Sequence, residues 1–386
     1  MRYVLTNCKI FTSEKILTEH SLVISAGKIL AVIADRDIDN QDQQIDLNGH
    51  LLTPGFIDTQ VNGGGGVLFN NSPTLESIAA IGKAHRAYGT TGFLPTLISD
   101  DLATMQLAIE ASQQALIAQT PGFLGLHMEG PYLNKLRKGV HCETKLHSPD
   151  QQSLAMLQAL AQIGRSIVTL APEVVPAGFI KQLSQQGVTV AVGHSNASYE
   201  IIKQALLDGA SGFTHLYNAM SPLTSREPGV VGAALEDPHS WCGIIVDGFH
   251  VHPASLKIAI KAKPAGKVIL VTDAVHTVGA TGSTFDLVGR SIYRDNGKVT
   301  TKEGTLAGSD LDMASAVRNC VKLLGLELSE ALRMASLYPA QFLNIADKVG
   351  KIAPGCQANL TLLDDDLQVM DTWIDGIASN PLAYRR

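Results

Sequence analysis

Four residues that could bind a metal ion or move a proton stand at the ends of separate apolar runs. Three of these runs contain HMEGP, VGHSN and FTHLYNAM, which supply Glu129, His194 and His215. A glutamate with two histidines is a zinc-binding set that leaves a fourth position open for water. The fourth run, VTDA, supplies Asp273. A carboxylate beside such a site can accept a proton from water and deliver it to a leaving group, so the set predicts amide or ester hydrolysis.

Each of these residues also has an ordinary interpretation. A single histidine on an apolar strand is more often a hydrogen-bonded core residue than a ligand, and an aspartate after a strand often caps the following turn. We favour the metal and catalytic interpretation because four such residues close four separate runs. We expect His127, on the same strand face as Glu129, and His276 to occupy core or supporting positions.

Two carboxamides, Gln60 and Asn62, follow the apolar run in TPGFIDTQVNGGGG. Residues two apart on a strand point to the same face, so both side chains should reach one site. They either hydrogen-bond to neighbouring loops or contact water or substrate directly, and the sequence leaves both options open.

The elements that must position these residues form a regular series. Apolar runs typical of buried parallel strands alternate with segments of helical spacing, and the eight runs are LTPGFIDTQ, TGFLPTLIS, FLGLHMEG, SIVTLAPE, VTVAVGHSN, GFTHLYNAM, WCGIIVDGFH and KVILVTDAV. Helices are expected at 74–89, 153–164, 198–210, 310–323 and 328–343. Eight strand–helix units predict an α/β fold of the (β/α)8 TIM-barrel type, whose active site lies at the carboxyl ends of the strands. After the eighth run, Asn-Gly in YRDNGKVTT predicts an inserted β-hairpin.

Both ends of the chain have a different pattern of apolar and polar residues. Residues 1–50 and 349–386 read as short alternating strands, with Ala26-Gly27 as a hairpin turn. We therefore expect a small β-sandwich domain built from both termini, around a catalytic barrel at residues 51–348.

Composition excludes several classes of protein. The 386 residues are 45% hydrophobic and 17% charged, and the net charge of −6 offers no basic surface for nucleic acid. No apolar run reaches the roughly 18 residues of a membrane span, and the N-terminus lacks the pattern of a signal peptide. We expect a cytoplasmic protein. The five scattered cysteines indicate neither disulfides nor a thiolate metal site.

The motifs together resemble the amidohydrolase superfamily and, within it, the N-acetylglucosamine-6-phosphate deacetylase family. The resemblance spans the whole chain and rests on PGFID-x-Q-x-NG (54–63), LHMEGP (126–131), KGVH (138–141), VGHSNA (192–197), THLYNAM (214–220), DGFHV (247–251), VTDA (271–274) and LAGSDLDM (306–313). It implies hydrolysis of N-acetyl-D-glucosamine 6-phosphate to D-glucosamine 6-phosphate and acetate, in amino-sugar catabolism or cell-wall recycling.

The resemblance also implies roles for individual residues. His141 polarises the acetyl oxygen, and Asp273 passes a proton to the amine. The phosphate is held by Arg226, by His250 and by backbone amides at Asn218 and Ala219. The stretch LAGS, with Leu306, Ala307 and Gly308, packs on the sugar and acetyl group, although its residues could equally begin a helix. A partner subunit helps to close the phosphate site, which implies a homodimer.

The metal count follows from a departure from the superfamily pattern. Most amidohydrolases carry His-x-His after the first strand and bind a second metal there, whereas this chain has Gln60-x-Asn62. A carboxamide oxygen is a poorer ligand than imidazole for such ions. We predict one divalent ion per subunit on Glu129, His194 and His215, with Zn2+ preferred over Fe2+, Co2+ or Mn2+.

Three alternatives remain at this point. The enzyme could prefer the galacto epimer, N-acetylgalactosamine 6-phosphate. It could be a cyclic-amide hydrolase of the dihydroorotase kind, although such enzymes resemble the two-metal pattern that this chain lacks. It could also be a non-catalytic amidohydrolase-like assembly protein that would bind little metal.

Overall fold

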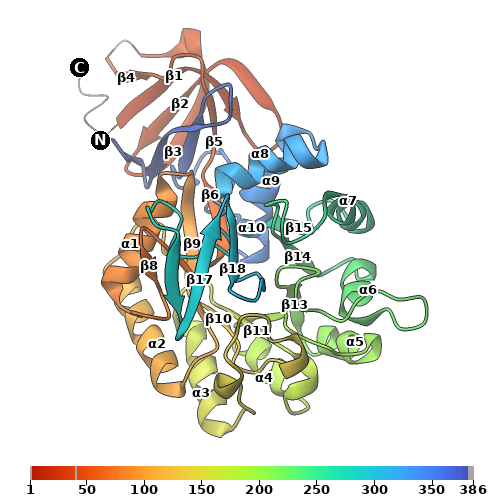
Figure 1. Cartoon of the computed structure of the whole chain (residues 1–386). Coiled ribbons are helices and arrows are strands. Elements are labelled where there is room, and N and C mark those ends of the chain that lie inside the picture. The colour runs from red at the N-terminus through yellow and green to blue at the C-terminus, as the bar shows by residue number, and fades with distance from the viewer. Residues whose placement is uncertain (1, 40, 381–386) are drawn as a thin grey trace.

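A computed structural model describes residues 2–39 and 41–380 (Figure 1). Both ends of the chain meet in one eight-stranded sheet, drawn at the top of Figure 1. Its strands are β1 (Arg2–Phe11), β2 (Ile16–Ser25), β3 (Lys28–Ala34), β4 (Gln43–Asp46), β5 (Leu51–Pro54), β19 (Leu360–Leu363), β20 (Val369–Ile374) and β21 (Ile377–Ala378). The order is β21-β20-β19-β5-β1-β2-β3, and β4 pairs with β1. The small β domain from both termini is thereby confirmed.

The junction between the two parts lies close to the expected boundary. β5 pairs with β1 and with β19, so the terminal sheet extends four residues beyond residue 50 before the chain enters the barrel. The predicted turn between β2 and β3 is present: Ala26 and Gly27 both have positive φ, at 50° and 78°. The domain limits themselves remain a prediction.

The middle of the chain is a barrel of eight parallel strands, as the apolar runs predict. The strands are β6 (Phe56–Val61), β9 (Thr90–Ile98), β10 (His127–Glu129), β11 (Ile167–Leu170), β12 (Thr189–Val192), β13 (Ala210–Phe213), β14 (Trp241–Ile244) and β15 (Val268–Leu270). They follow one another in sequence order around the sheet. A parallel bridge between Val61 and Ala274 joins the first strand to the segment after the last, which brings their carboxyl ends to one rim.

Helices surround the barrel on its outer face (Figure 1). They are α1 (Leu75–Arg86), α2 (Leu102–Ile117), α3 (Gln151–Ala159), α4 (Phe179–Gln185), α5 (Tyr199–Leu207), α6 (Gly229–Glu236), α7 (Pro253–Ala262), α8 (Met313–Leu324), α9 (Leu328–Ala335) and α10 (Leu337–Phe342). The prediction of one continuous helix over 328–343 is wrong, because two helices, α9 and α10, occupy this range. The break lies at Ser336, whose φ of −134° and ψ of −71° are not helical.

Two small antiparallel sheets are inserted between elements of the barrel. The first is a short ribbon of β7 (Gly63–Gly64) and β8 (Val67–Leu68). The second consists of β16 (Thr284–Leu287), β17 (Arg290–Asp295) and β18 (Lys298–Thr301). Asn296 and Gly297 form its tip with φ of 48° and 81°, the left-handed pair that an Asn-Gly hairpin turn requires. The predicted hairpin is confirmed, and below we call β16 to β18 the insert hairpin.

Separate apolar cores support the two parts. The barrel core includes fully buried Phe56, Phe69 and Tyr132, and the terminal sheet closes over Trp373. Among the described residues, none of the helices has the length and hydropathy needed to cross a membrane. The barrel interior is therefore a packed apolar core, and it supports the residues at the carboxyl ends of the strands.

Candidate active site

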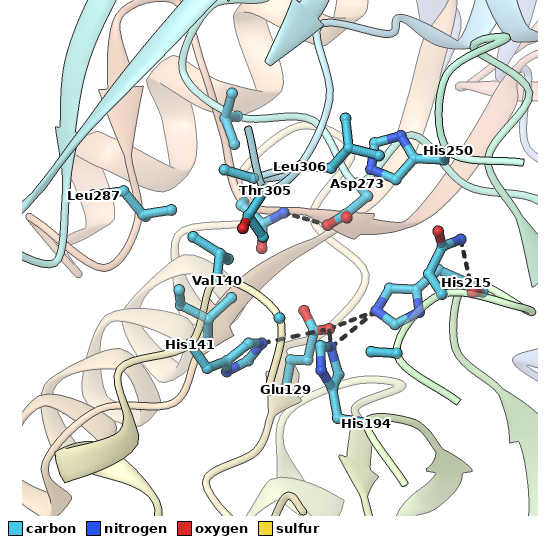
Figure 2. A pocket seen from close by; sticks show the side chains of 18 residues that line it. Glu129, Val140, His141, His194, His215, His250, Asp273, Leu287, Thr305 and Leu306 are labelled. Atoms are coloured by element: carbon cyan, nitrogen blue, oxygen red, sulfur yellow. Dashed lines mark hydrogen bonds and ion pairs between the residues drawn. The ribbon is translucent and has the colours of Figure 1, made fainter. Parts of the chain in front are cut away.

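Glu129, His194 and His215 meet at the carboxyl rim of the barrel (Figure 2). Glu129 ends β10, and each histidine follows its strand by two residues, with left-handed φ of 49° at His194 and 33° at His215. Glu129 Oε1 lies 2.9 Å from His194 Nε2 and 3.0 Å from His215 Nε2. The two Nε2 atoms are themselves 3.0 Å apart. All three side chains are buried. Three separate strands thus bring potential ligand atoms together at one site enclosed by the protein.

The hydrogen bonds of His194 fix which nitrogen faces that point. Its Nδ1 lies 2.8 Å from the carbonyl oxygen of Arg137, which can only accept. Nδ1 therefore carries a proton in both the neutral and the charged ring, and Nε2 faces the cluster, where the neutral ring offers a lone pair to a metal. Ligand atoms around a tetrahedral ion with bonds of about 2.1 Å lie about 3.4 Å apart. The observed separations of 2.9 to 3.0 Å need only a small expansion, so the set fits a divalent metal.

The charges in the cluster favour the ionised form of Glu129. Burial alone would raise the pKa of its carboxyl. Hydrogen bonds from His194 and His215, together with their positive charge, outweigh burial and hold the pKa of Glu129 well below its usual range. A buried carboxylate that stays ionised is stable only beside cationic partners, and a bound cation would serve the same purpose.

His141 lies at the edge of the same cluster. Its Nε2 is 3.9 Å from Glu129 Oε1, and Glu129, His141 and His194 also form a group of potential metal ligands within 4.8 Å of one another. The backbone N–H of Ser99 donates to His141 Nδ1 at 3.3 Å, and Ser99 Oγ lies 2.8 Å from the same nitrogen. Nδ1 is thus the acceptor and Nε2 carries the proton. Burial and the charge of His194 lower the pKa of His141 to about 3, so a neutral N–H donor faces the pocket.

Asp273 lies across the pocket from the three ligand candidates (Figure 2). Burial and the negative charge of Glu129 raise the pKa of Asp273 to about 6, whereas His215, His250 and a hydrogen bond from Asn62 act in the opposite direction. A carboxylate poised near neutral pH is suited to accept and release a proton.

The carboxamides of Gln60 and Asn62 hold the two carboxylates. Gln60 Nε2 donates to Glu129 Oε2 at 3.2 Å and to Asp273 Oδ1 at 3.1 Å. Asn62 Nδ2 donates to the same Asp273 oxygen at 2.6 Å. Of the two options that the sequence left open, the geometry favours hydrogen bonding, because both amide groups serve as donors to acids. Asn62 also lines the pocket, whereas Gln60 lies beneath it.

The pocket encloses about 160 Å³ and combines polar and apolar walls. Of the residues predicted to contact substrate, it is lined by Asn62, His141, Asn218, Ala219, His250, Leu306, Ala307 and Gly308. The segment around Asn218 has positive φ at His215, Tyr217 and Ala219, an alternation typical of backbone nests that bind anions. His250 Nδ1 is bound to Asp247 Oδ2 at 2.6 Å, which leaves Nε2 for the pocket.

Besides Gln60, Arg226 is the predicted substrate ligand that lies outside this pocket. It is exposed in the loop between β13 and α6 and does not line the cavity of its own chain. The backbone N–H of Asn218, which was expected to face the phosphate, donates to the His215 carbonyl at 3.0 Å. Any contact between Arg226 and a bound phosphate therefore requires another subunit or a movement of the loop.

Two supporting residues escaped the sequence analysis. Ser99, which fixes the tautomer of His141, directly follows β9, so the rule that identified Glu129 could also have found it. Asp58 Oδ2 accepts a hydrogen bond from Thr272 Oγ1 at 2.5 Å, and burial raises the pKa of its carboxyl to about 7. Asp58 thereby ties β6 to the segment that carries Asp273.

His127 occupies the core, where its two ring nitrogens contact the Thr59 carbonyl and Thr169 Oγ1.

A (β/α)8 barrel with a buried Glu-His-His cluster and a facing aspartate defines a metal-dependent hydrolase. The amidohydrolase family model matches residues 51–380, and the NagA composite domain matches residues 2–52. The chain belongs to the amidohydrolase family.

Its relatives in this family act on phosphorylated amino sugars according to their names. An N-acetylgalactosamine-6-phosphate deacetylase of Shewanella sp. (strain ANA-3) is 43% identical, over 93% of this chain and 92% of the relative. An N-acetylglucosamine-6-phosphate deacetylase of Haemophilus influenzae is 37% identical, over 97% of this chain and 99% of the relative.

Solved structures of such deacetylases have the same fold as this chain. The N-acetylglucosamine-6-phosphate deacetylase of Pasteurella multocida matches with a TM-score of 0.95 and 37% identity, over 98% of this chain and 100% of that one. The Mycobacterium smegmatis enzyme, in a mutant form complexed with N-acetyl-D-glucosamine 6-phosphate, matches with a TM-score of 0.89 and 31% identity, over 98% and 99% of the two chains. The resemblance seen in the sequence motifs is confirmed.

Proposed function

We propose that this protein hydrolyses N-acetyl-D-glucosamine 6-phosphate to D-glucosamine 6-phosphate and acetate. The observation that supports this most directly is the convergence of Glu129, His194 and His215 opposite Asp273 in one buried pocket, in a chain that matches a relative named as such a deacetylase over 99% of that relative. The same observation argues against a non-catalytic assembly protein, which has no need to keep ionisable groups buried together.

One divalent metal ion per subunit completes the site in this proposal, held by Glu129, His194 and His215, with Zn2+ preferred. Such an ion supplies Lewis-acid polarisation and lowers the pKa of water. The His-x-His pair of two-metal enzymes is replaced by Gln60 and Asn62, whose amide groups donate to the carboxylates. A carboxamide oxygen is a poorer ligand than imidazole for such ions, so the replacement supports a single ion and counts against a two-metal cyclic-amide hydrolase.

The protein groups have separate tasks in the reaction. The Nε2–H of neutral His141 donates to the acetyl oxygen, where negative charge develops. Asp273 in its ionised form accepts the proton of the attacking water and passes it to the amide nitrogen, so that the amine leaves in a neutral form. Gln60 and Asn62 hold Asp273 in position for both transfers.

The phosphate occupies the end of the pocket near His250 and the nest at 215–219. His250 donates from Nε2, because Asp247 holds its Nδ1. Arg226, exposed in its own chain, reaches the phosphate of a neighbouring subunit in a homodimer. A charge-assisted contact of this kind is worth about 2 to 3 kcal/mol, so Arg226→Ala should raise KM substantially.

The galacto epimer is a second candidate substrate, because the Shewanella relative at 43% identity is named for N-acetylgalactosamine 6-phosphate. Side-by-side turnover of the two sugar phosphates, with elemental analysis of the same sample, tests both the reaction and the epimer. We expect hydrolysis of the gluco substrate with about one equivalent of metal per chain. A clear preference for the galacto epimer would replace the substrate and leave the reaction type intact. The expected setting is cytoplasmic amino-sugar catabolism or cell-wall recycling.

A further inference from the structure

A second, wider hollow adjoins the catalytic pocket. It has a volume of about 720 Å³ and is bounded on one side by Lys138 and Gly139 and on the other by residues of the insert hairpin and its exit, Arg290, Ser291, Tyr293, Thr301, Lys302, Glu303 and Thr305. Gly139 and Thr305 line both cavities, so the hollow lies directly beside the catalytic pocket. We call it the cationic groove.

The charge of this groove is opposite to that of the protein. Three cations, Lys138, Arg290 and Lys302, line it against one carboxylate, Glu303, although the net charge of the chain is −6. Within residues 2–39 and 41–380, none of the three cations has an ion-pair partner inside 4 Å. Their charge is therefore available to a ligand.

The groove lies at the opposite end of the pocket from the phosphate site. Val140 and Leu287, which flank the pocket on the groove side, stand across from His250 in Figure 2. Arg290 Nη1 donates to the Val140 carbonyl at 3.4 Å and so ties the insert hairpin to the loop that carries His141. A phosphate seated beside His250 would not contact the groove, so the three cations must act before the substrate is bound.

The electrostatic interaction between an incoming anion and each charge of the protein weakens with distance. At physiological ionic strength the screening length is about 8 Å, so remote surface charges contribute little at the mouth of the pocket. Local cations then outweigh the overall charge, and a concave wall concentrates their field. On this basis we propose that the cationic groove is the entry site that attracts the phosphomonoester dianion of the substrate and directs it into the pocket. This inference rests on the proposed function, because it needs a phosphorylated substrate.

The test measures kcat/KM of the metal-loaded enzyme with N-acetyl-D-glucosamine 6-phosphate between about 0.1 M and 1 M salt, where the screening length falls from about 10 to 3 Å. Lys302 is the residue to change, because its side chain is exposed and does not line the catalytic pocket. We expect Lys302→Gln and Lys302→Glu to reduce kcat/KM stepwise, by about two- to fivefold per unit of charge at low salt. All curves should converge at high salt, and the loss should fall on kcat/KM rather than on kcat.

Lys181, exposed on α4, offers a matched control. Lys181→Gln and Lys181→Glu make the same changes in net charge outside the groove and should follow the wild-type curve. The proposal is wrong if Lys302→Glu retains the wild-type salt dependence, or if Lys181→Glu lowers kcat/KM equally. Absence of turnover by the wild-type enzyme is a different result: it would refute the proposed function, and the ligand assigned to the groove with it.

Discussion

The carboxamide nitrogen of Gln60 lies 3.1 Å from Oδ1 of Asp273. The same nitrogen is 3.2 Å from Oε2 of Glu129, so one neutral donor joins the proposed proton carrier to the proposed metal ligand. Two carboxylates held this close repel each other unless donors or cations lie between them. Gln60 and Asn62 supply such donors from β6, and the acid–base behaviour of the site depends on them.

The pH profile should report this arrangement. Asp273 must be ionised to accept a proton, and its pKa is raised to about 6, so kcat/KM should rise with pH along an acid limb whose midpoint lies no higher than about 6 and should level off above it. A bound cation draws this limb to lower pH. Asn62→Leu removes a hydrogen bond that lowers the pKa of Asp273, so its acid limb should lie at higher pH than that of the wild type. Superimposable profiles would show that Asn62 does not influence the base.

Asp273→Asn should reduce kcat by about two to four orders of magnitude with little change in KM, because it removes proton transfer and preserves the shape of the pocket. Steady-state kinetics and the metal content of the variant are the measurements. Near-normal turnover with full metal occupancy would assign the base to another group.

Chelation should abolish activity and lower the melting temperature, since an ion bound only by the folded state stabilises it. Zn2+, Co2+ or Mn2+ should restore both, at about one equivalent per chain by elemental analysis. Glu129→Gln should weaken metal retention, because it removes the charged ligand that both histidines contact. Full activity below about half an equivalent would exclude the metal mechanism.

Mixed subunits test whether Arg226 serves a neighbouring site. A chain with Arg226→Ala and a chain with Asp273→Asn are each expected to be impaired alone. In a homodimer that shares Arg226, random exchange gives one complete site in half of the dimers, so activity should recover to about a quarter of wild type. Recovery is measured after co-refolding or co-expression of the two chains. No recovery would indicate that Arg226 acts within its own chain or has no role in the site.

Features that depend on a single strand could be predicted from the sequence. Strands of a parallel barrel are buried on both faces, so all eight appear as continuous apolar runs, and the polar residues at or just after their ends led to Glu129, His194, His215 and Asp273. The insert hairpin followed from Asn-Gly, which accepts the left-handed turn.

Features that depend on the meeting of distant segments could not be predicted in this way. Gln60 and Asp273 are separated by 213 residues, and their contact is set by the closure of the barrel rather than by local sequence. The exposure of Arg226 depends on how the loop after β13 leaves the rim. The break at Ser336, by contrast, has a local cause that the helical spacing conceals: Pro339 has no N–H to donate to the Ala335 carbonyl and its ring crowds that carbonyl, so α9 ends there and α10 begins anew.

The terminal sheet described above has a consequence for biosynthesis. β5 pairs with β1 on one side and with β19 on the other, and more than 300 residues of barrel are translated between β5 and β19. The ribosome therefore delivers every barrel strand before the last partner of the first strands exists. The barrel can assemble during translation, but the N-terminal strands must wait with an unpaired edge until β19 to β21 emerge from the exit tunnel.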